Sequence, residues 1–281
     1  MEEAPGPFVP QGKRKPGRYR VKSTGLRPAA TTGEFMVDTK GSTVTYLAHS
    51  AFLLTTASGS VGIIDPFLQN PNCPKEFKKL EKLDVIFLSH AHGDHLGDTV
   101  ELARKHNAAI ACMFETSLWL NEKCLEAQTR PMGKGGTQKI GEFAVTMTHA
   151  MHSNSIEDGK HVVYAGEPAG LVIRMPGGFS VYHAGDTCVF SDMKLIGELY
   201  KPDVALLPIG DRFTMGPREA AMAVKFLGVK HVVPMHYATF PVLTGTPEEF
   251  QKECTGIAGV SVHVMKPGES LGGAAAAGRG K

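Results

Sequence analysis

The stretch LSHAHGDHLGD, residues 88–98, places three histidines and two aspartates within eleven residues. It continues the apolar run DVIFL (84–88), which is typical of a buried strand that ends at a site. His90 and His92 lie two residues apart, so in an extended chain both side chains leave on the same side. The start of the stretch therefore predicts two nitrogen ligands for one metal ion.

The second half of the stretch predicts ligands for a neighbouring ion. Gly93 permits a sharp change of direction, because glycine adopts backbone conformations that other residues avoid. Asp94 and His95 follow on the new heading and offer an oxygen and a nitrogen ligand. Imidazole and carboxylate suit zinc, manganese, nickel or iron, and the absence of cysteine from the stretch disfavours a structural zinc site. Asp98 lies beyond these residues and is expected to cap the next helix.

Three further candidate ligands share one context, because each lies just past an apolar strand. His152 follows FAVTMTHAM, Asp186 follows FSVYHAG and His236 follows HVVPM. Loops that follow strands meet at one edge of a sheet, so these side chains are expected to converge with the histidine-rich stretch. Together the patterns predict a metal site built at strand ends.

Apolar periodicity predicts a chain in which early strands are followed by alternating strands and helices. Pro217 and Gly228 mark the start and the end of one helix. The order of elements favours two packed sheets with helices outside, an α/β sandwich, and leaves the strand order open. The expected helices cover 99–106, 115–125, 192–200, 216–228 and 247–254. The expected strands cover 43–56, 60–67, 84–90, 108–112, 142–152, 170–175, 179–186, 203–211, 230–237 and 260–265.

Composition indicates an ordinary globular protein with tails. The chain has 281 residues, 42% of them apolar, and a net charge of +2 that gives no global reason to expect nucleic acid. No apolar run is long enough for a membrane span or a secretory signal, and the five scattered cysteines favour a reducing, cytoplasmic compartment. Residues 1–41 are predicted to be a basic Pro/Gly-rich extension, 42–270 the domain that carries the candidate metal site, and 271–281 a low-complexity tail.

The motifs resemble those of the metallo-β-lactamase superfamily. SHAHGDH (89–95) resembles its His-x-His-x-Asp-His signature, AGDT (184–187) its later aspartate motif and PMHY (234–237) its last histidine motif. Residues 42–266 are most similar to a subgroup of predicted metal-dependent hydrolases that is similar to the ascorbate-6-phosphate lactonases, and more distantly to the phospholipase that cleaves N-acyl phosphatidylethanolamines. The segments that carry this likeness are YLAHSAFLL, IDPFLQNP, EPAGLVI, VYHAGDT, DMKLIGELY, ALLPIGDRFTMGP and MHYATFP.

The resemblance implies an αββα four-layer sandwich with a dinuclear site between the sheets. It implies one ion on His90, His92 and His152, a second on Asp94, His95 and His236, and Asp186 bridging. Two divalent ions roughly 3.5–4 Å apart can share a hydroxide and lower its pKa toward neutrality. Asp94 or Asp186 would then orient the nucleophile or accept its proton.

Several residues near these motifs leave alternatives open. His149 competes with His152, although the His-Ser pair at 152–153 fits the subgroup better. His49 is expected in the site as a ligand or a transition-state contact, with a buried structural role as the alternative. His183 is a candidate ligand support or substrate contact, and Asp65 resembles the aspartate that supports the histidine loop. Arg212 could anchor an anionic group, with an ordinary surface arginine as the alternative.

These patterns predict a metal-dependent hydrolase that attacks an ester, lactone or phosphodiester. Nucleases with an inserted domain, glyoxalase II, secreted β-lactamases and flavodiiron proteins fit less well, because their extra domains or signals are missing from the sequence. The alternatives are an RNA or nucleotide phosphodiesterase, which the basic extension would assist, and a metal-binding interaction module without turnover. Zinc, manganese and nickel all suit the ligands, and the sequence gives neither the substrate nor the oligomeric state, so a homo-oligomer stays open.

Overall fold

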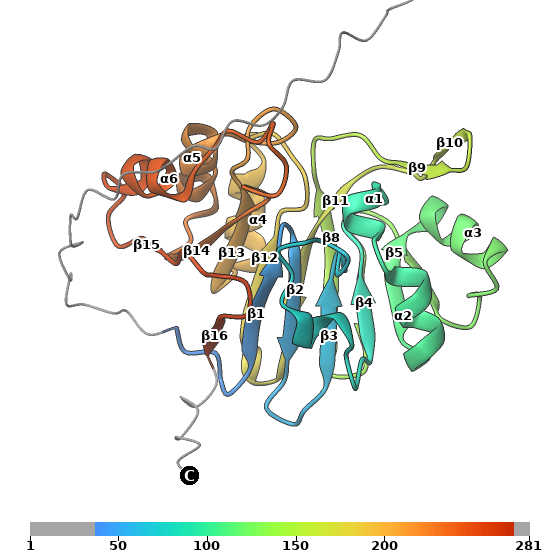
Figure 1. Ribbon diagram of the computed structural model, residues 1–281. Coiled ribbons are helices and arrows are strands. Elements are labelled where there is room, and N and C mark those ends of the chain that lie inside the picture. Colours follow the sequence, from blue (N-terminus) through green and yellow to red (C-terminus); the bar gives the residue numbers. More distant parts are fainter. Residues whose placement is uncertain (1–36, 273–281) are drawn as a thin grey trace, which may run out of the picture. The chain divides into compact units, whose positions relative to one another are not determined.

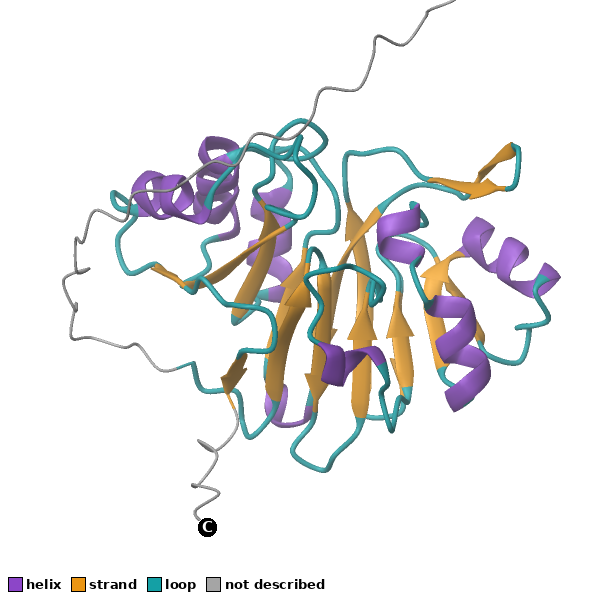
Figure 2. Cartoon of the chain, viewed as in Figure 1, coloured by secondary structure: helices purple, strands orange, loops and turns teal. Residues whose placement is uncertain are grey.

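The computed structural model describes residues 37–272. Most of the predicted extension (1–41) and of the predicted tail (271–281) lies outside these residues. Within them, two sheets pack face to face and helices cover the outer face of each (Figure 1). The element-coloured view shows the same order, with strands between two groups of helices (Figure 2). The predicted αββα sandwich is confirmed.

The first sheet has seven strands in the order β16-β1-β2-β3-β4-β5-β6. Strands β3 to β6 run parallel, whereas β16, β1, β2 and β3 pair antiparallel in succession. Its strands are β1 (Thr43–Ala48), β2 (Ala51–Thr55), β3 (Val61–Ile64), β4 (Val85–Phe87), β5 (Ala109–Met113), β6 (Thr129–Met132) and β16 (Ser270–Gly272).

The second sheet also has seven strands, in the order β15-β14-β13-β12-β11-β8-β7. Strands β12 to β15 run parallel, and β7, β8, β11 and β12 pair antiparallel in succession. Its strands are β7 (Thr137–Ile140), β8 (Phe143–His149), β11 (Ala169–Arg174), β12 (Ser180–His183), β13 (Val204–Pro208), β14 (His231–Met235) and β15 (Ser261–Val262). The strands β9 (Ser155–Asp158) and β10 (His161–Tyr164) form a separate hairpin.

Three apolar clusters hold the four layers together. One lies between the sheets, where Phe52 and Phe87 of the first meet Phe143 and Leu171 of the second. The other two lie between a sheet and its helices. Burying apolar surface on both faces of each sheet is the main stabilising term for such a sandwich.

The helices are α1 (Gly93–Leu96), α2 (Thr99–His106), α3 (Phe114–Glu122), α4 (Met193–Tyr200), α5 (Pro217–Leu227) and α6 (Pro247–Cys254), with short 3-10 turns at Lys75–Lys78 and Pro176–Gly178.

The strand directions bring the carboxyl ends of six strands to one edge of the sandwich. In the first sheet, β1, β3 and β4 run the same way, and in the second sheet β8, β12 and β14 do. A main-chain bond from the His236 N–H to the His49 carbonyl joins the two sheets at this edge. The loops after these strands carry the candidate ligands.

Most of the expected helices and strands form, but the strands near the end of the described residues differ from the prediction. The helix at 216–228 starts at Pro217 and ends at Gly228, which has a φ of 63°. The expected last strand, 260–265, is only Ser261–Val262. Strand β16 was not predicted, and it places Leu271 and Gly272 in a sheet although the predicted tail begins at 271. No helix among residues 37–272 combines the length and apolarity needed to cross a bilayer.

Candidate metal centre

The first group of candidate ligands is His90, His92 and His152, whose ligand atoms lie within 4.8 Å of one another. The first two follow β4, and His152 follows β8 in the facing sheet. His90 Nε2 lies 3.0 Å from His92 Nδ1, closer than two lone pairs tolerate without a proton or a cation between them. The sequence-predicted trio therefore converges from both sheets.

The second group is His49, Asp94, His95 and His236, again within 4.8 Å. Asp94 and His95 lie in the short helix α1, which begins at Gly93 and turns the chain away from β4. His236 follows β14 and His49 follows β1. Three of these four are the predicted second set, and His49 joins them.

Asp186 lies between the two groups. Its Oδ2 is 3.0 Å from His236 Nε2 and 3.7 Å from His152 Nε2. Its Oδ1 is 3.3 Å from His95 Nε2. One buried carboxylate thus faces nitrogens of both groups, the position expected for a bridging ligand.

Asp65 and Ser89 set the tautomers of two of the histidines. Ser89 donates its main-chain N–H and its hydroxyl to the two oxygens of Asp65. Because the Ser89 proton is used there, its oxygen accepts from His90 Nδ1–H. His95 donates its Nδ1–H to the same Asp65 carboxylate at 2.8 Å. In the neutral rings the Nε2 lone pairs of His90 and His95 then point into the site, as metal binding requires.

Two buried atoms at this point fit a bound cation. His95 Nε2 and Asp186 Oδ1 are buried and have no hydrogen-bond partner among the described residues. Leaving such atoms unpaired costs about 1–3 kcal/mol each. Nitrogen and oxygen donors without sulfur match divalent transition metals, so the residues present fit such ions.

Strained backbone accompanies the site. His49, Asp65 and His236 have φ values of 56°, 43° and 56°, in the left-handed region that non-glycine residues avoid. Each such residue costs about 1–2 kcal/mol and persists only where its surroundings fix it. Each follows a strand directly or after one residue, so the sharp turn aims its side chain at the shared edge.

The electrostatics keep most of the ring nitrogens free for a metal. Burial lowers the pKa values of His90, His92 and His152, and it lowers the pKa of His49 to about 4. Burial also acts to lower the pKa of His95, but the Asp186 and Asp65 carboxylates outweigh it and raise that pKa well above its ordinary value.

Metal uptake is therefore expected to release a proton from His95. Without metal the ring carries protons on both nitrogens, and Nε2 must lose its proton to bind a cation. The affinity of the metal-free protein for Zn²⁺ should therefore fall as the pH is lowered, because a proton competes with the metal for Nε2. Competition titrations with a chelator measure this pH dependence, and a His263→Gln variant serves as the control. A pH-independent affinity would contradict the assignment.

Two cavities give access to the site. One of about 460 Å³ is lined by Phe67, His92, Asp94 and Phe240, with Ser155 and Glu157 of the hairpin. The other, of about 620 Å³, is lined among others by His152, Met151, Tyr164 and Cys188. The Asp94 side chain is 26% exposed, whereas His49 is fully buried. A substrate that enters the 460 Å³ cavity therefore meets Asp94 directly, whereas His49 lines neither of these two cavities.

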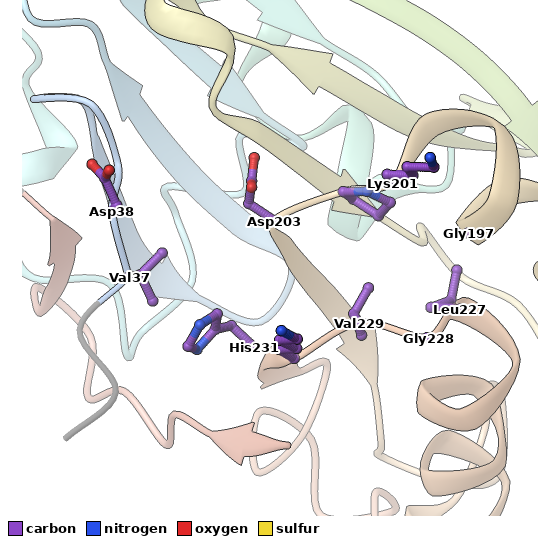
Figure 3. A pocket seen from close by; sticks show the side chains of 11 residues that line it. Val37, Asp38, Gly197, Lys201, Asp203, Leu227, Gly228, Val229 and His231 are labelled. Carbon is purple, nitrogen blue, oxygen red and sulfur yellow. The ribbon is translucent and has the colours of Figure 1, made fainter. Parts of the chain in front are cut away.

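A third cavity, of about 320 Å³, lies at the opposite edge of the second sheet (Figure 3). It is lined by residues that precede β13 and begin β14, among them Asp203 and His231. The Asp203 carboxylate accepts hydrogen bonds from the main-chain N–H and the hydroxyl of Ser180, so it serves the fold. No metal-binding group was found here among residues 37–272.

Three candidates from the sequence lie away from the metal ligands. His149 is exposed and contacts Lys134 Nζ at 3.1 Å, so its neighbour His152 occupies the site instead. His183 is buried, and its ring bonds to the Ser50 carbonyl and the Gly185 N–H, which leaves no nitrogen for a substrate. The predicted substrate contact is therefore wrong for His183. Arg212 is exposed over the ring of Phe213 and lines none of the three cavities described above.

Two supporting residues were not singled out from the sequence. Asn154 Oδ1 accepts from the Ala91 N–H at 2.8 Å and so holds the chain between His90 and His92. Thr239 Oγ1 lies 3.0 Å from His49 Nδ1. The only signal was their proximity to histidine motifs, which does not identify a hydrogen-bond partner. Asp98 begins α2 without a side-chain cap and instead accepts from the N–H groups of Leu68 and Gln69, so the expected cap is wrong.

Comparisons with known proteins show which family the chain resembles. A profile of the β-lactamase superfamily domain matches residues 56–237. The chain is 51% identical over 236 residues to a metal-dependent hydrolase of Rubrobacter xylanophilus, covering 83% of this chain and 97% of that one. It is 47% identical over 235 residues to a metal-dependent hydrolase of Koribacter versatilis, covering 83% and 99%.

Solved structures of other proteins have the same overall fold. A metallo hydrolase from the archaeon Ignicoccus hospitalis superposes with a TM-score of 0.73 at 36% identity, covering 82% of this chain and 97% of that one. An isothiocyanate hydrolase from Delia radicum gut bacteria has a TM-score of 0.66 at 18% identity, covering 83% and 100%, and shares the fold.

Proposed function

This chain belongs to the β-lactamase superfamily as a metal-dependent hydrolase, and from that membership we propose that it cleaves ester, lactone or phosphodiester bonds at a dinuclear centre. The observation that carries the proposal is Asp186, which faces nitrogens of two separate ligand groups. We assign one ion to His90, His92 and His152. We assign the other to Asp94, His95 and His236, with Asp186 shared.

When bound, divalent ions at these sites supply an activated water and stabilise negative charge on the substrate oxygen. The residues of the chain position that chemistry. Asp94 lies at the mouth of the cavity, where its carboxylate can orient the attacking water and accept its proton. Asp186, buried beneath it, holds the two groups of ligands at a fixed separation.

His49 acts on the reaction through Asp94. Its Nε2 lies 3.0 Å from Asp94 Oδ2, and its Nδ1 lies 3.0 Å from the Thr239 hydroxyl. Because burial keeps the ring neutral, an Nε2–H that donates to the Asp94 carboxylate leaves Nδ1 facing the Thr239 hydroxyl without a proton of its own. The bond holds the carboxylate in one orientation, so we assign His49 a positioning role rather than contact with the substrate.

The proposal is tested by metal analysis together with a substrate screen. Protein purified without added metal should contain about two divalent transition ions per chain. Reconstitution with manganese, zinc or nickel should give metal-dependent turnover of p-nitrophenyl esters, lactones or bis(p-nitrophenyl) phosphate. A chain that takes up no metal would refute the proposal. Bound metal with no turnover of any class would favour the interaction-module alternative.

A further inference from the structure

The β9–β10 hairpin stands apart from both sheets and has two unlike faces. Its register pairs Val162 with Glu157 and Tyr164 with Ser155, so these four side chains share one face. Ile156 and Val163 lie on the other face and pack into the cluster beneath the first sheet. Figure 1 shows the hairpin beyond α1 and α3, outside the two sheets.

The inner face of the hairpin is anchored. Ile156 is only 2% exposed. Asp158 accepts from Trp119 Nε1 at 2.8 Å and from Lys123 Nζ at 3.0 Å, which ties β9 to α3. The hairpin is therefore held in a fixed place, and its other face is presented in a fixed direction.

That other face is open, and its two side chains from β10 are largely apolar. Val162 is 74% exposed and Tyr164 is 68% exposed. Scattered exposed apolar residues are ordinary, but these two lie on one face together with residues that line the routes to the metal centre. Ser155 and Glu157 line the cavity that holds His92 and Asp94, and Tyr164 lines the cavity that holds His152. The face is thus continuous with the walls of the site.

The charge around these cavities disfavours anions. The acidic residues that line them are Asp94, Glu157 and Glu167, and their described lining includes no lysine or arginine. The nearby Lys134 ammonium is paired with Glu167 at 2.6 Å. Because Asp94 is itself an assigned ligand, Glu157 is the carboxylate that an approaching phosphate or carboxylate would meet at the cavity wall before it reached the ligands.

We propose that the outer face of the β9–β10 hairpin recognises the substrate, and that it selects an uncharged ester or lactone carrying an apolar chain or ring. The inference rests on the proposed function, since it assigns the substrate class of the same centre. Val162 and Tyr164 cover the apolar group, and Glu157 repels anionic competitors. The cleaved bond lies at the metal ligands, and the apolar group extends along the hairpin.

Chain-length preference tests the proposal in the metal-reconstituted full chain. The protein should prefer p-nitrophenyl hexanoate to p-nitrophenyl acetate by about tenfold in kcat/KM, because four further methylene groups are partly buried. The double variant Val162→Ser/Tyr164→Ser should reduce this preference to about threefold or less, mainly by raising KM for the hexanoate. A preference that the double variant leaves intact would overturn the proposal.

A matched control lies on α4. Leu195 and Leu199 are 52% and 71% exposed, and they line neither cavity at the metal centre. Leu195→Ser/Leu199→Ser should keep the full preference for the hexanoate. The charge is tested with Glu157→Lys, which should raise the ratio of kcat/KM for bis(p-nitrophenyl) phosphate to kcat/KM for the acetate by about fivefold at low salt. No gain for the phosphodiester would contradict the role of Glu157.

A binding measurement separates this proposal from the proposed function. Trp119 is the single tryptophan of the chain, and it is bonded to the hairpin through Asp158. Hexyl p-nitrophenyl ether, which cannot be hydrolysed, should quench its fluorescence even in the metal-free protein, and more weakly in the hairpin double variant. Quenching without ester turnover would refute the hydrolase proposal alone. If the double variant instead dissociates an oligomer and binds the ether normally, the face is a subunit contact and the recognition proposal is wrong.

Discussion

Replacing Asp186 by alanine is expected to strip divalent metal from both ligand groups and to lower metal-dependent turnover at least about a hundredfold. The Asp186 carboxylate lies within 4 Å of ring nitrogens from His95, His152 and His236. Burial raises the pKa of Asp186, but the neighbouring His236 and His95 lower it further, to well below its ordinary value. The group is therefore an anion at neutral pH and is available as a ligand.

Elemental analysis and turnover of the same preparation measure this effect. Asp192→Ala is a suitable control, because Asp192 is exposed and precedes α4, and among the described residues its side chain hydrogen-bonds only with Ser191. A variant that kept its full metal content would show that each group binds its ion independently. The shared-carboxylate assignment would then be wrong, although two separate sites could still stand.

The second large effect is expected at Asp65, and it concerns stability as well as metal. Asp65→Ala removes the acceptor for the Ser89 N–H, the Ser89 hydroxyl and His95 Nδ1–H. Each buried donor left unpaired costs about 1–3 kcal/mol, so the free energy of unfolding should fall by roughly 3 kcal/mol or more. For a domain of this size, that corresponds to a melting temperature lower by about 6–12 °C.

The Asp65→Ala variant should also bind metal about 10–100-fold more weakly, because the tautomers of His90 and His95 are no longer fixed. Thermal unfolding of the metal-free protein separates the stability effect from the loss of bound metal. Asp65→Asn retains an acceptor for the Ser89 N–H and should lie between the wild type and the alanine variant. If Asp65→Ala melted like the wild type, the bonds drawn to this carboxylate would not stabilise the fold.

The fold could be predicted to a large extent because its elements have strong periodic signals. The helices at 99–106 and 247–254 match the structure at both ends. The convergence of His152, Asp186 and His236 was also predictable, since each follows an apolar strand and parallel strands end at a common edge. What periodicity could not give was the order of strands, which depends on contacts between distant segments.

The features missed from the sequence have a shared cause. Strand β16 is three residues long, and it pairs with β1 across more than two hundred residues, so no local pattern signals it. The hairpin mixes polar and apolar residues on four-residue strands, too short for a clear period. The burial of His49 likewise depends on Thr239, Asp94 and the ring of His236, whose centroid lies 4.0 Å from that of His49. These contacts join residues that are far apart in the sequence, so they exist only once the chain has folded and cannot be seen in a local sequence pattern.

The separateness of the β9–β10 hairpin has a consequence for how this protein can diversify. Its two strands pair only with each other, whereas the strands that deliver the metal ligands are paired within the two large sheets. Insertions, deletions or exchange of residues 157–162 would leave every ladder of those sheets intact. If the hairpin recognises the substrate as proposed, changes in its sequence, whether natural or engineered, can alter substrate preference without altering the metal ligands.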